Sequence, residues 1–166
     1  MTTVLFLCTG NAARSVMAGV ALGEKRPDLH IETAGTLTVD GMPISWRTRA
    51  ALSAHALPFP RHKSKQATRL HLDQADVVIG LAPEHVEWVR RQYPHVAERT
   101  ATLGFLAERL TPSEAALHER LGALDLARRN LEPWEEVADP GGGEVEAFVA
   151  AARHVVELID KLAVRL

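Results

Sequence analysis

The segment spanning residues 4–26 restricts the fold more than any other part of the chain. Val4–Leu7 is a short apolar run of the kind that forms a buried strand. The run ends at Cys8, the only cysteine of the protein, and the Thr-Gly-Asn sequence of residues 9–11 is typical of a tight turn. From Arg14 onward the apolar residues recur at helical spacing. The segment therefore predicts a strand, a tight loop and a helix, with Cys8 at the mouth of the helix.

This arrangement has a chemical consequence for Cys8. The first turn of a helix has unpaired N–H groups and the positive end of the helix dipole, so it binds anions. A thiol placed there is favoured as the thiolate, which is the nucleophilic form. Arg14 follows six residues later and can clasp two oxygens of an oxyanion with its forked guanidinium. Together these groups indicate attack on a tetrahedral oxyanion such as a phosphomonoester.

A lone cysteine at the end of an apolar strand is more often a small buried hydrophobe than a nucleophile. The Cys-x5-Arg spacing alone does not decide between these readings, because 15 of the 166 residues are arginine. The Gly10-Asn11 turn, Ser15 after Arg14 and the helical pattern that follows favour the catalytic interpretation.

Residues 8–15 read Cys-Thr-Gly-Asn-Ala-Ala-Arg-Ser and are followed by Val-Met-Ala. This stretch resembles the signature of the low-molecular-weight protein tyrosine phosphatases, whose fold and loop the related arsenate reductases share. The resemblance implies that Cys8 is the nucleophile, that Arg14 clamps the phosphate and that Ser15 hydrogen-bonds the Cys8 sulfur. The phosphate would be bound by the loop residues Thr9, Gly10, Asn11, Ala12, Ala13, Arg14 and Ser15.

Composition limits the class of protein. Apolar residues make up 46% of the chain and charged residues 24%, as in soluble globular proteins, and the length suits a single domain over residues 1–166. A formal net charge of −2 gives no reason to expect nucleic acid or an anionic membrane as partner. The sequence has neither a signal-peptide pattern nor an apolar run long enough to span a bilayer. One cysteine fits a reducing cytoplasm.

No cofactor or metal is expected. The eight histidines show no ligand spacing with the cysteine or with paired carboxylates. Nothing in the sequence specifies the oligomeric state.

The rest of the chain alternates between strand and helix patterns. Strands are predicted at residues 30–34, 75–81 and 100–105, and helices at residues 43–56, from Pro83 onward, after a capping box formed by Thr111 and Glu114, and over residues 145–162. Alternation without an internal repeat predicts a three-layer α/β fold. The resemblance implies a four-stranded parallel sheet with helices on both faces and the site at the carboxyl ends of the strands. Residues 111–134 have no functional interpretation.

A second chemical element precedes the last predicted helix. Asp139-Pro-Gly-Gly would by itself indicate only a turn. A cysteine-dependent phosphatase, however, needs a proton for the leaving oxygen and later a base for water, and one carboxylate on a mobile loop can supply both. The family carries its general acid in an Asp-Pro motif at this place, so the resemblance implies this role for Asp139.

Three further positions take their interpretation from the resemblance. Trp46 would form a wall of the substrate pocket, although tryptophan more often packs in a core. His62 would hydrogen-bond Asn11 and support the loop without being catalytic. Where many family members have an aromatic residue as the second wall, this chain has Gly141, which weakens the case for tyrosine specificity.

Two loop positions also depart from many family members. Ala13 stands where they have a second cysteine, so a protective disulfide with Cys8 is not possible here. Ala12 occupies a position at which members differ, and where threonine accompanies phosphoarginine preference in some.

The sequence therefore predicts a metal-independent protein-tyrosine phosphatase that forms a cysteinyl-phosphate intermediate on Cys8. An arsenate reductase that uses a small thiol is an alternative, because residues 11–15 also fit that branch. A protein-arginine phosphatase is a second alternative. A phosphate-binding module without catalysis is the least favoured, since nucleophile, clamp and acid are all present.

Overall fold

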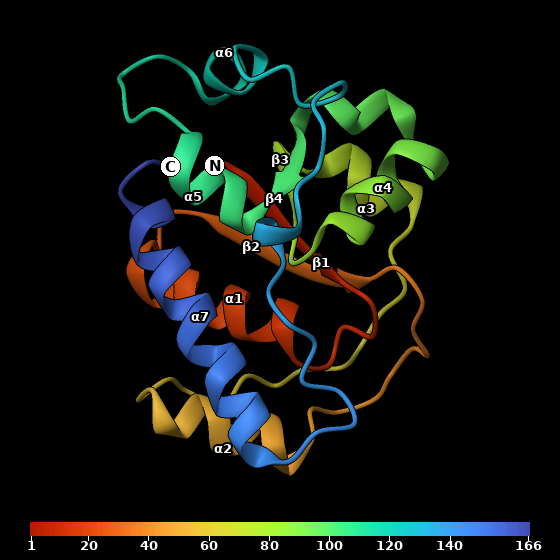
Figure 1. The fold of residues 1–166 in the computed structure, drawn as a ribbon, viewed down its shortest axis with the longest axis vertical. Helices are drawn as coiled ribbons and strands as arrows, with labels where there is room; N and C mark the ends of the chain where they lie inside the picture. The colour runs from red at the N-terminus through yellow and green to blue at the C-terminus, as the bar shows by residue number, and fades with distance from the viewer.

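A computed structural model describes residues 1–166 and contains one four-stranded sheet (Figure 1). The strands are β1 (Thr3–Cys8), β2 (His30–Gly35), β3 (Val77–Gly80) and β4 (Thr100–Thr102). They lie in the order β2-β1-β3-β4, and every pair is parallel. The predicted three-layer fold with a four-stranded parallel sheet is confirmed.

Helices cover both faces of the sheet. Figure 1 shows α1 (Arg14–Lys25) and α7 (Val145–Ala163) on one side, and α3 (Arg69–Gln74) and α4 (Pro83–Gln92) on the other. α2 (Trp46–Ala54) and α5 (Leu103–Arg109) pack against α7, and α6 (Leu117–Gly122) lies near one end. Two 3₁₀ helices span Pro94–Arg99 and Pro133–Glu135. None of these helices is both long and apolar enough to cross a bilayer.

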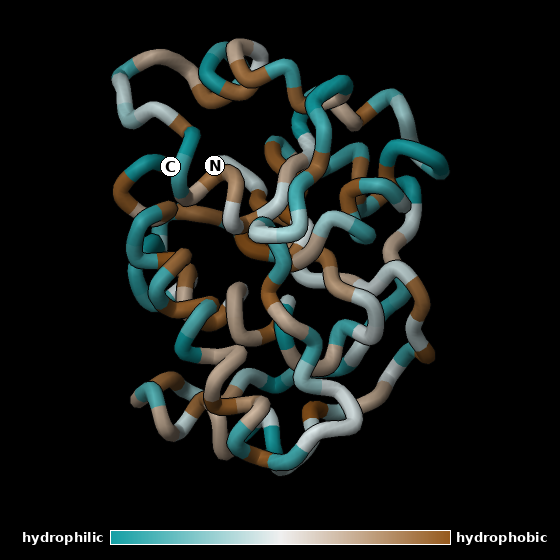
Figure 2. The backbone as a smooth tube through the Cα atoms, viewed as in Figure 1, coloured by the Kyte–Doolittle hydropathy of each residue, from teal (hydrophilic) through white to brown (hydrophobic).

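Alternation along β1 divides the core into two parts. Val4 and Phe6 point into a cluster of 30 buried residues shared with α1 and α7, while Leu5 and Leu7 point into a cluster of 9 shared with α3 and α4. All four side chains are fully buried, as expected for a central strand covered on both faces. Figure 2 shows hydrophobic residues gathered along the central strands, whereas hydrophobic and hydrophilic residues alternate along the helices. The larger cluster holds β1, and therefore Cys8 at its end, against α1 and α7.

Two sequence predictions in the second half of the chain are wrong. Thr111 and Glu114 do not form a capping box, because residues 111–116 are exposed and nonhelical and α6 begins only at Leu117. A local hydrogen bond from Ala115 N–H to Ser113 Oγ offers this backbone an alternative to the helix.

The strand predicted over residues 100–105 is also too long. It ends at Thr102, whose hydroxyl accepts a hydrogen bond from Phe105 N–H and so caps α5. The apolar residues after Thr102 therefore continue as a helix instead of a strand. The short α3 helix falls where the sequence shows no helical period.

Candidate active site

In the loop that follows β1, every carbonyl of residues 8–13 is hydrogen-bonded, whereas the amides of residues 9–13 are free. The C=O groups of residues 8–13 each accept a hydrogen bond, from Thr36 N, Leu37 N, Thr38 Oγ1, His62 Nε2, Thr48 Oγ1 and Met17 N in turn. By contrast, none of the N–H groups of residues 9–13 donates to any group of the protein. Five unpaired donors on one tight loop at the start of α1 make an anion-binding cradle. This is the strongest physical indication of function in the molecule.

Asn11 holds the loop in this conformation. Its backbone has a φ of 51°, in the left-handed region, and the residue is fully buried. Its Nδ2 donates to Ser15 Oγ and to Thr33 Oγ1, both at 3.0 Å, and its Oδ1 accepts from Lys65 N–H. Asparagine tolerates the left-handed region better than most residues. The polar contacts of its side chain therefore fix a turn that the backbone alone would not hold.

Ser15 links Asn11 to the cysteine. Its Oγ lies 3.0 Å from Cys8 Sγ and accepts the hydrogen bond from Asn11. Because Asn11 supplies a donor to this oxygen, the Ser15 hydroxyl hydrogen is available to the sulfur. Cys8 is only 3% exposed and lies at the base of the loop. A thiolate there would receive a hydrogen bond from Ser15 as well as the field of the helix.

Arg14, at the end of the loop, forms an ion pair with Asp139. The Arg14 guanidinium is 2% exposed; Nη1 donates to Val137 O at 3.0 Å and Nη2 lies 3.4 Å from Asp139 Oδ2. Val137 is buried, and its own N–H donates to Leu81 O at the end of β3. Asp139 itself is 58% exposed, and its Oδ1 accepts from Gly141 N–H. Val137 thus joins the acid-bearing segment to both the sheet and the arginine.

These groups enclose a cavity of about 290 Å³. Besides the loop, it is lined by Asp139, Gly141, Ser45, Thr48 and Phe148. Sequence reasoning did not place the last three in the site. In the sequence Phe148 looks like any other apolar residue of α7. The contact of Thr48 with the loop is a hydrogen bond from its Oγ1 to Ala12 O, which only the structure shows.

Trp46 does not line this cavity. It begins α2, is 54% exposed and has the Arg47 guanidinium 4.8 Å from its ring centroid. Its neighbour Ser45 caps the helix and lines the cavity instead. The alternative that Trp46 packs in the core does not hold in this structure, and its role as a pocket wall stays a prediction.

The arrangement matches a known family. The sequence model of the family described as "Low molecular weight phosphotyrosine protein phosphatase" matches residues 3–119. The chain belongs to this family. It is therefore a phosphatase.

Relatives of this phosphatase cover nearly its whole length. It is 27% identical over 164 residues to a protein-arginine-phosphatase of Geobacillus stearothermophilus, covering 98% of this chain and 95% of the relative. It is 26% identical over 159 residues to the low molecular weight protein-tyrosine-phosphatase PtpB of Staphylococcus aureus, covering 96% and 95%.

Solved structures agree with this. A low molecular weight protein tyrosine phosphatase from T. tengcongensis superposes with a TM-score of 0.79 at 26% identity, with both chains fully covered. The YwlE arginine phosphatase from Geobacillus stearothermophilus gives 0.77 at 26% identity, covering 98% of this chain and 91% of the other.

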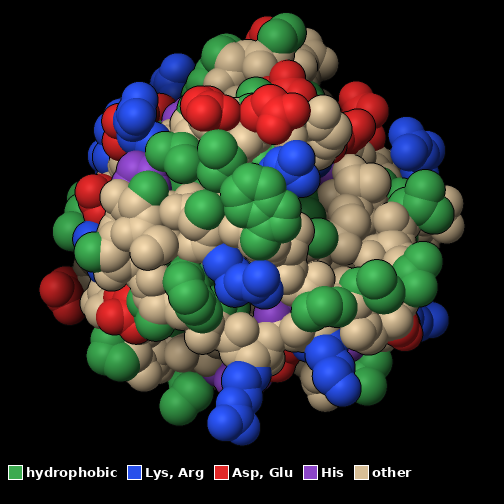
Figure 3. Space-filling view, turned by 90° about the horizontal axis from the view of Figure 1, so that it is seen from below, with side chains coloured by type: hydrophobic (Ala, Val, Ile, Leu, Met, Phe, Trp, Pro, Cys, Tyr) green, Lys and Arg blue, Asp and Glu red, His purple; other side chains and the backbone are tan.

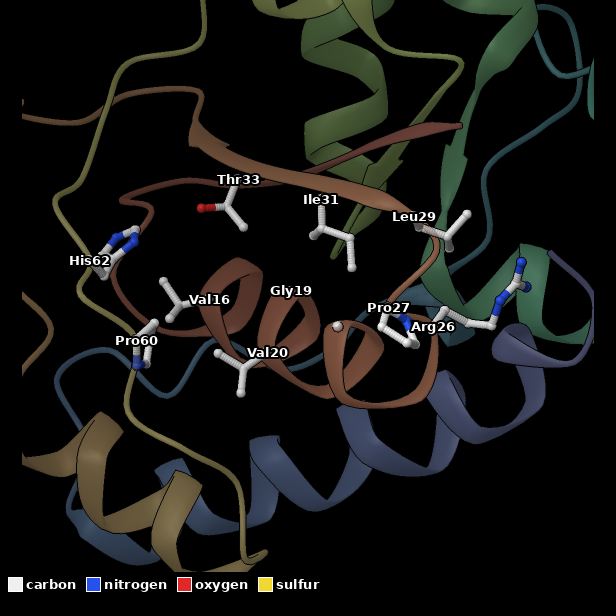
Figure 4. A pocket seen from close by; sticks show the side chains of 11 residues that line it. Val16, Gly19, Val20, Arg26, Pro27, Leu29, Ile31, Thr33, Pro60 and His62 are labelled. Carbon is white, nitrogen blue, oxygen red and sulfur yellow. The ribbon is translucent and has the colours of Figure 1, made fainter. Parts of the chain in front are cut away.

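Behind the loop of the phosphatase lies a second hollow of about 410 Å³ between α1, β2 and the segment containing Pro60 (Figure 4). Figure 4 shows Thr33 and His62 at one end of it and Arg26 at the other. Both Thr33 and His62 bond Asn11 from this side, His62 Nε2 at 2.6 Å from Asn11 O. Burial, and to a lesser degree Lys65, lowers the pKa of His62, so the neutral ring donates to that carbonyl. The hollow contains no nucleophile or acid.

Proposed function

We propose that this phosphatase hydrolyses phosphorylated proteins through a cysteinyl-phosphate on Cys8. The observation that carries the proposal is the loop whose five free N–H groups and buried Arg14 surround the place above the cysteine sulfur. These groups supply the positive field that an oxyanion of phosphorus needs in its transition state.

In the first step the Cys8 thiolate attacks phosphorus in line. The P–S bond forms as the P–O bond to the leaving group breaks, and Asp139 gives its proton to the departing oxygen. In the second step the Asp139 carboxylate accepts a proton from water. The oxygen of that water attacks phosphorus, the P–S bond breaks, and inorganic phosphate and the Cys8 thiolate are released. The hydrogen bond from Ser15 stabilises the sulfur as it leaves.

Phosphotyrosine is the substrate that the family description favours. The surroundings of the cavity suit a protein rather than a small ester. The segment of residues 36–42 is bonded to the loop through Leu37 N–H and Thr38 Oγ1, and the side chains of Leu37, Val39 and Met42 are exposed. Figure 3 shows exposed hydrophobic side chains interspersed with Lys and Arg on one face of the molecule.

Phosphoarginine is the second candidate. It is favoured by the similarity to a protein-arginine-phosphatase over 98% of this chain. Gly141, in the position of the missing second aromatic wall, also lines the cavity beside Asp139 without contributing a side chain to it. We further propose that residues 1–166 act as one domain in the cytoplasm. We also propose that neither nucleic acid nor a membrane is a partner, because a net charge of −2 gives no basic field to attract them.

The test is turnover of p-nitrophenyl phosphate in the presence of a chelator. We expect Cys8→Ser to abolish turnover and Asp139→Ala to lower kcat about 100-fold or more, because general acid catalysis contributes about 100-fold or more. Asp160→Ala is the matched control. That carboxylate is 52% exposed and also ion-paired, to Lys25, but lies in α7 outside the cavity.

The substrate is decided by comparing kcat/KM for one peptide carrying phosphotyrosine with the same peptide carrying phosphoarginine. Arsenate with a small thiol is assayed in parallel. Reduction of arsenate without release of phosphate from any substrate would overturn the proposal, and so would full activity in Cys8→Ser.

A further inference from the structure

A buried histidine that the proposed mechanism does not use lies against the phosphate-binding loop. His85 is in the first turn of α4, on the opposite face of the sheet from α1, and is 1% exposed. Its Nε2 lies 3.1 Å from the hydroxyl of Thr9, the residue directly after the nucleophile. Its Nδ1 is buried and has no partner. A buried imidazole with only one hydrogen bond is costly to keep, which raises the question of what it does.

The end of β3 is shaped to admit this ring. Gly80 is the last residue of β3, and a Cβ placed there would lie 3.0 Å from Cβ of His85 and 3.3 Å from Val86 Cγ2. Glycine at this position therefore lets the first turn of α4 approach the carboxyl end of the strand. The approach brings His85 to the loop from the face opposite to Asn11.

The surroundings also determine which nitrogen carries the proton. Burial first, and the nearby Arg14 second, lower the pKa of His85 to about 3, although Asp139 acts in the other direction. The ring is thus neutral. His85 belongs to the first turn of α4, where the helix dipole favours a lone pair over an N–H group on the unpartnered Nδ1. Nε2 faces two acceptors, Thr9 Oγ1 and, at 3.6 Å, the carboxylate of Glu84. The proton therefore belongs on Nε2.

A donor on Nε2 has a consequence for Thr9. Its hydroxyl oxygen accepts from His85, so the hydroxyl hydrogen remains available, and Thr9 lines the cavity that would hold the anion. The Thr9 carbonyl is held at the same time by Leu37 N–H. With the side chain and the carbonyl of Thr9 both held, the peptide plane that carries the Gly10 N–H has a fixed orientation.

We propose that His85 is a positioning residue of the phosphatase site, which donates from Nε2 to Thr9 and so fixes the first amide donors of the phosphate-binding loop. This rests on the proposed function for its catalytic consequence, but its effect on anion binding stands without turnover. His85 does not touch the reacting atoms and acts only through Thr9.

The experiment compares His85→Leu, which removes the donor, with His85→Gln, whose side-chain amide can replace it. Val89→Ala is the matched control, because Val89 is a buried residue one turn further along α4 and packs away from the loop. Anion binding is measured as the protection of Cys8 from iodoacetamide by inorganic phosphate, which needs no turnover. Thermal unfolding reports the stability of each variant.

We expect His85→Leu to weaken phosphate protection and to lower kcat/KM for p-nitrophenyl phosphate by about tenfold or more, since small displacements of catalytic groups cost up to about 100-fold. His85→Gln should recover most of the loss. Thr9→Val should cause a similar loss, and the double variant His85→Leu/Thr9→Val should be no worse than either single one.

The proposal is overturned if His85→Leu, like Val89→Ala, only lowers the melting temperature while phosphate protection and kcat/KM stay within twofold of wild type. Additive losses in the double variant would overturn it as well. If the wild-type protein shows phosphate protection but no turnover, the proposed function fails and the protection assay still decides the role of His85.

Discussion

At the scale of single residues, Asn11 combines a strained backbone with three side-chain hydrogen bonds. The two contributions can be separated. Glycine adopts a φ of 51° without strain but has no side chain, whereas alanine loses the same hydrogen bonds and adds the strain of a Cβ in the left-handed region.

We therefore expect Asn11→Gly and Asn11→Ala both to lower kcat/KM by at least tenfold and to destabilise the protein by about 2–3 kcal/mol through the lost buried hydrogen bonds. Asn11→Ala should be less stable than Asn11→Gly by about a further 1 kcal/mol. Urea unfolding measures the stabilities. Thr33→Val, which removes only one partner of Asn11, is the graded control and should cost about 1 kcal/mol. Equal stability of the glycine and alanine variants would show that the backbone is not strained.

The residue scale also shows where sequence reasoning stops. The contacts of Ser15 and His62 with their predicted partners are present at 3.0 Å and 2.6 Å, because a contiguous loop motif and a short family segment carry them. Thr48, Phe148 and His85 could not be found in this way. Each reaches the loop from a different helix, and their side chains have no pattern that separates them from ordinary core residues.

At the scale of elements, the segment between Val137 and α7 has one fixed end and one adaptable part. Val137 is anchored by a hydrogen bond from its N–H to Leu81 O and by one from the Arg14 guanidinium to its carbonyl, while the following residues form a turn closed by a hydrogen bond from Gly143 N–H to Pro140 O. Gly142 has a φ of 79°, and a Cβ there would meet nothing within 4 Å. A Cβ on Gly141 would instead lie 3.1 Å from Asp139 Oδ1. The two glycines therefore have different functions.

Alanine at each position distinguishes them. We expect Gly141→Ala to displace the Asp139 carboxylate and to lower kcat about tenfold, while Gly142→Ala strains the turn and costs about 1 kcal/mol of stability with a smaller change in kcat. The measurement is kcat of each glycine variant, once in the otherwise wild-type protein and once in the Asp139→Ala background. If Gly141 acts through the carboxylate, Gly141→Ala should have no further effect in that background. A loss that persists without the carboxylate would contradict this.

Helices and strands could be predicted from the sequence where a hydrophobic period extends over many residues or where the residues of a motif are contiguous. The pattern over residues 145–162 gave α7, and the apolar run before Cys8 gave β1. The failures have local physical causes. The Thr111 capping box lies in an exposed stretch that no core holds against α7 or the sheet, and Thr102 ends its strand because its hydroxyl caps the next helix. α3 has only six residues, fewer than two helical turns.

At the scale of the whole molecule, the fold lowers the pKa of several histidines and carboxylates, and each kind of group changes the free energy of unfolding in a different pH range. Burial lowers the pKa of His85, of His62 and of His71. In Glu135 the hydrogen bonds from Arg129 and Thr102 outweigh burial and lower the carboxyl pKa, and Glu32 beside Lys65 behaves in the same way. The free energy of unfolding therefore falls with the pH through all five groups, because in each case the unfolded chain takes up the proton at a higher pH than the folded protein does.

The order in which they cease follows from their pKa values in the unfolded chain. An unfolded histidine takes up a proton near pH 6.5, whereas the folded His85 takes one up only near pH 3, so the unfolded state binds more protons between these values. The free energy of unfolding therefore falls as the pH drops below about 6.5. The carboxylates add to the loss only below about pH 4.5, where the unfolded chain begins to protonate them.

We thus expect stability to decline between pH 6.5 and pH 5 through the histidines alone, with His85 contributing up to about 1.4 kcal/mol per pH unit and about 4 kcal/mol by pH 3. Urea unfolding at pH 7, 6 and 5 measures the slope. His85→Gln should flatten it by about that amount per pH unit, whatever its effect on stability at pH 7. His118→Gln, at an exposed histidine outside the site, serves as the control and should keep the wild-type slope. A slope in His85→Gln equal to that of the wild type would mean that His85 takes up its proton at the same pH in the folded protein as in the unfolded chain, which would contradict the low pKa that burial and Arg14 give it.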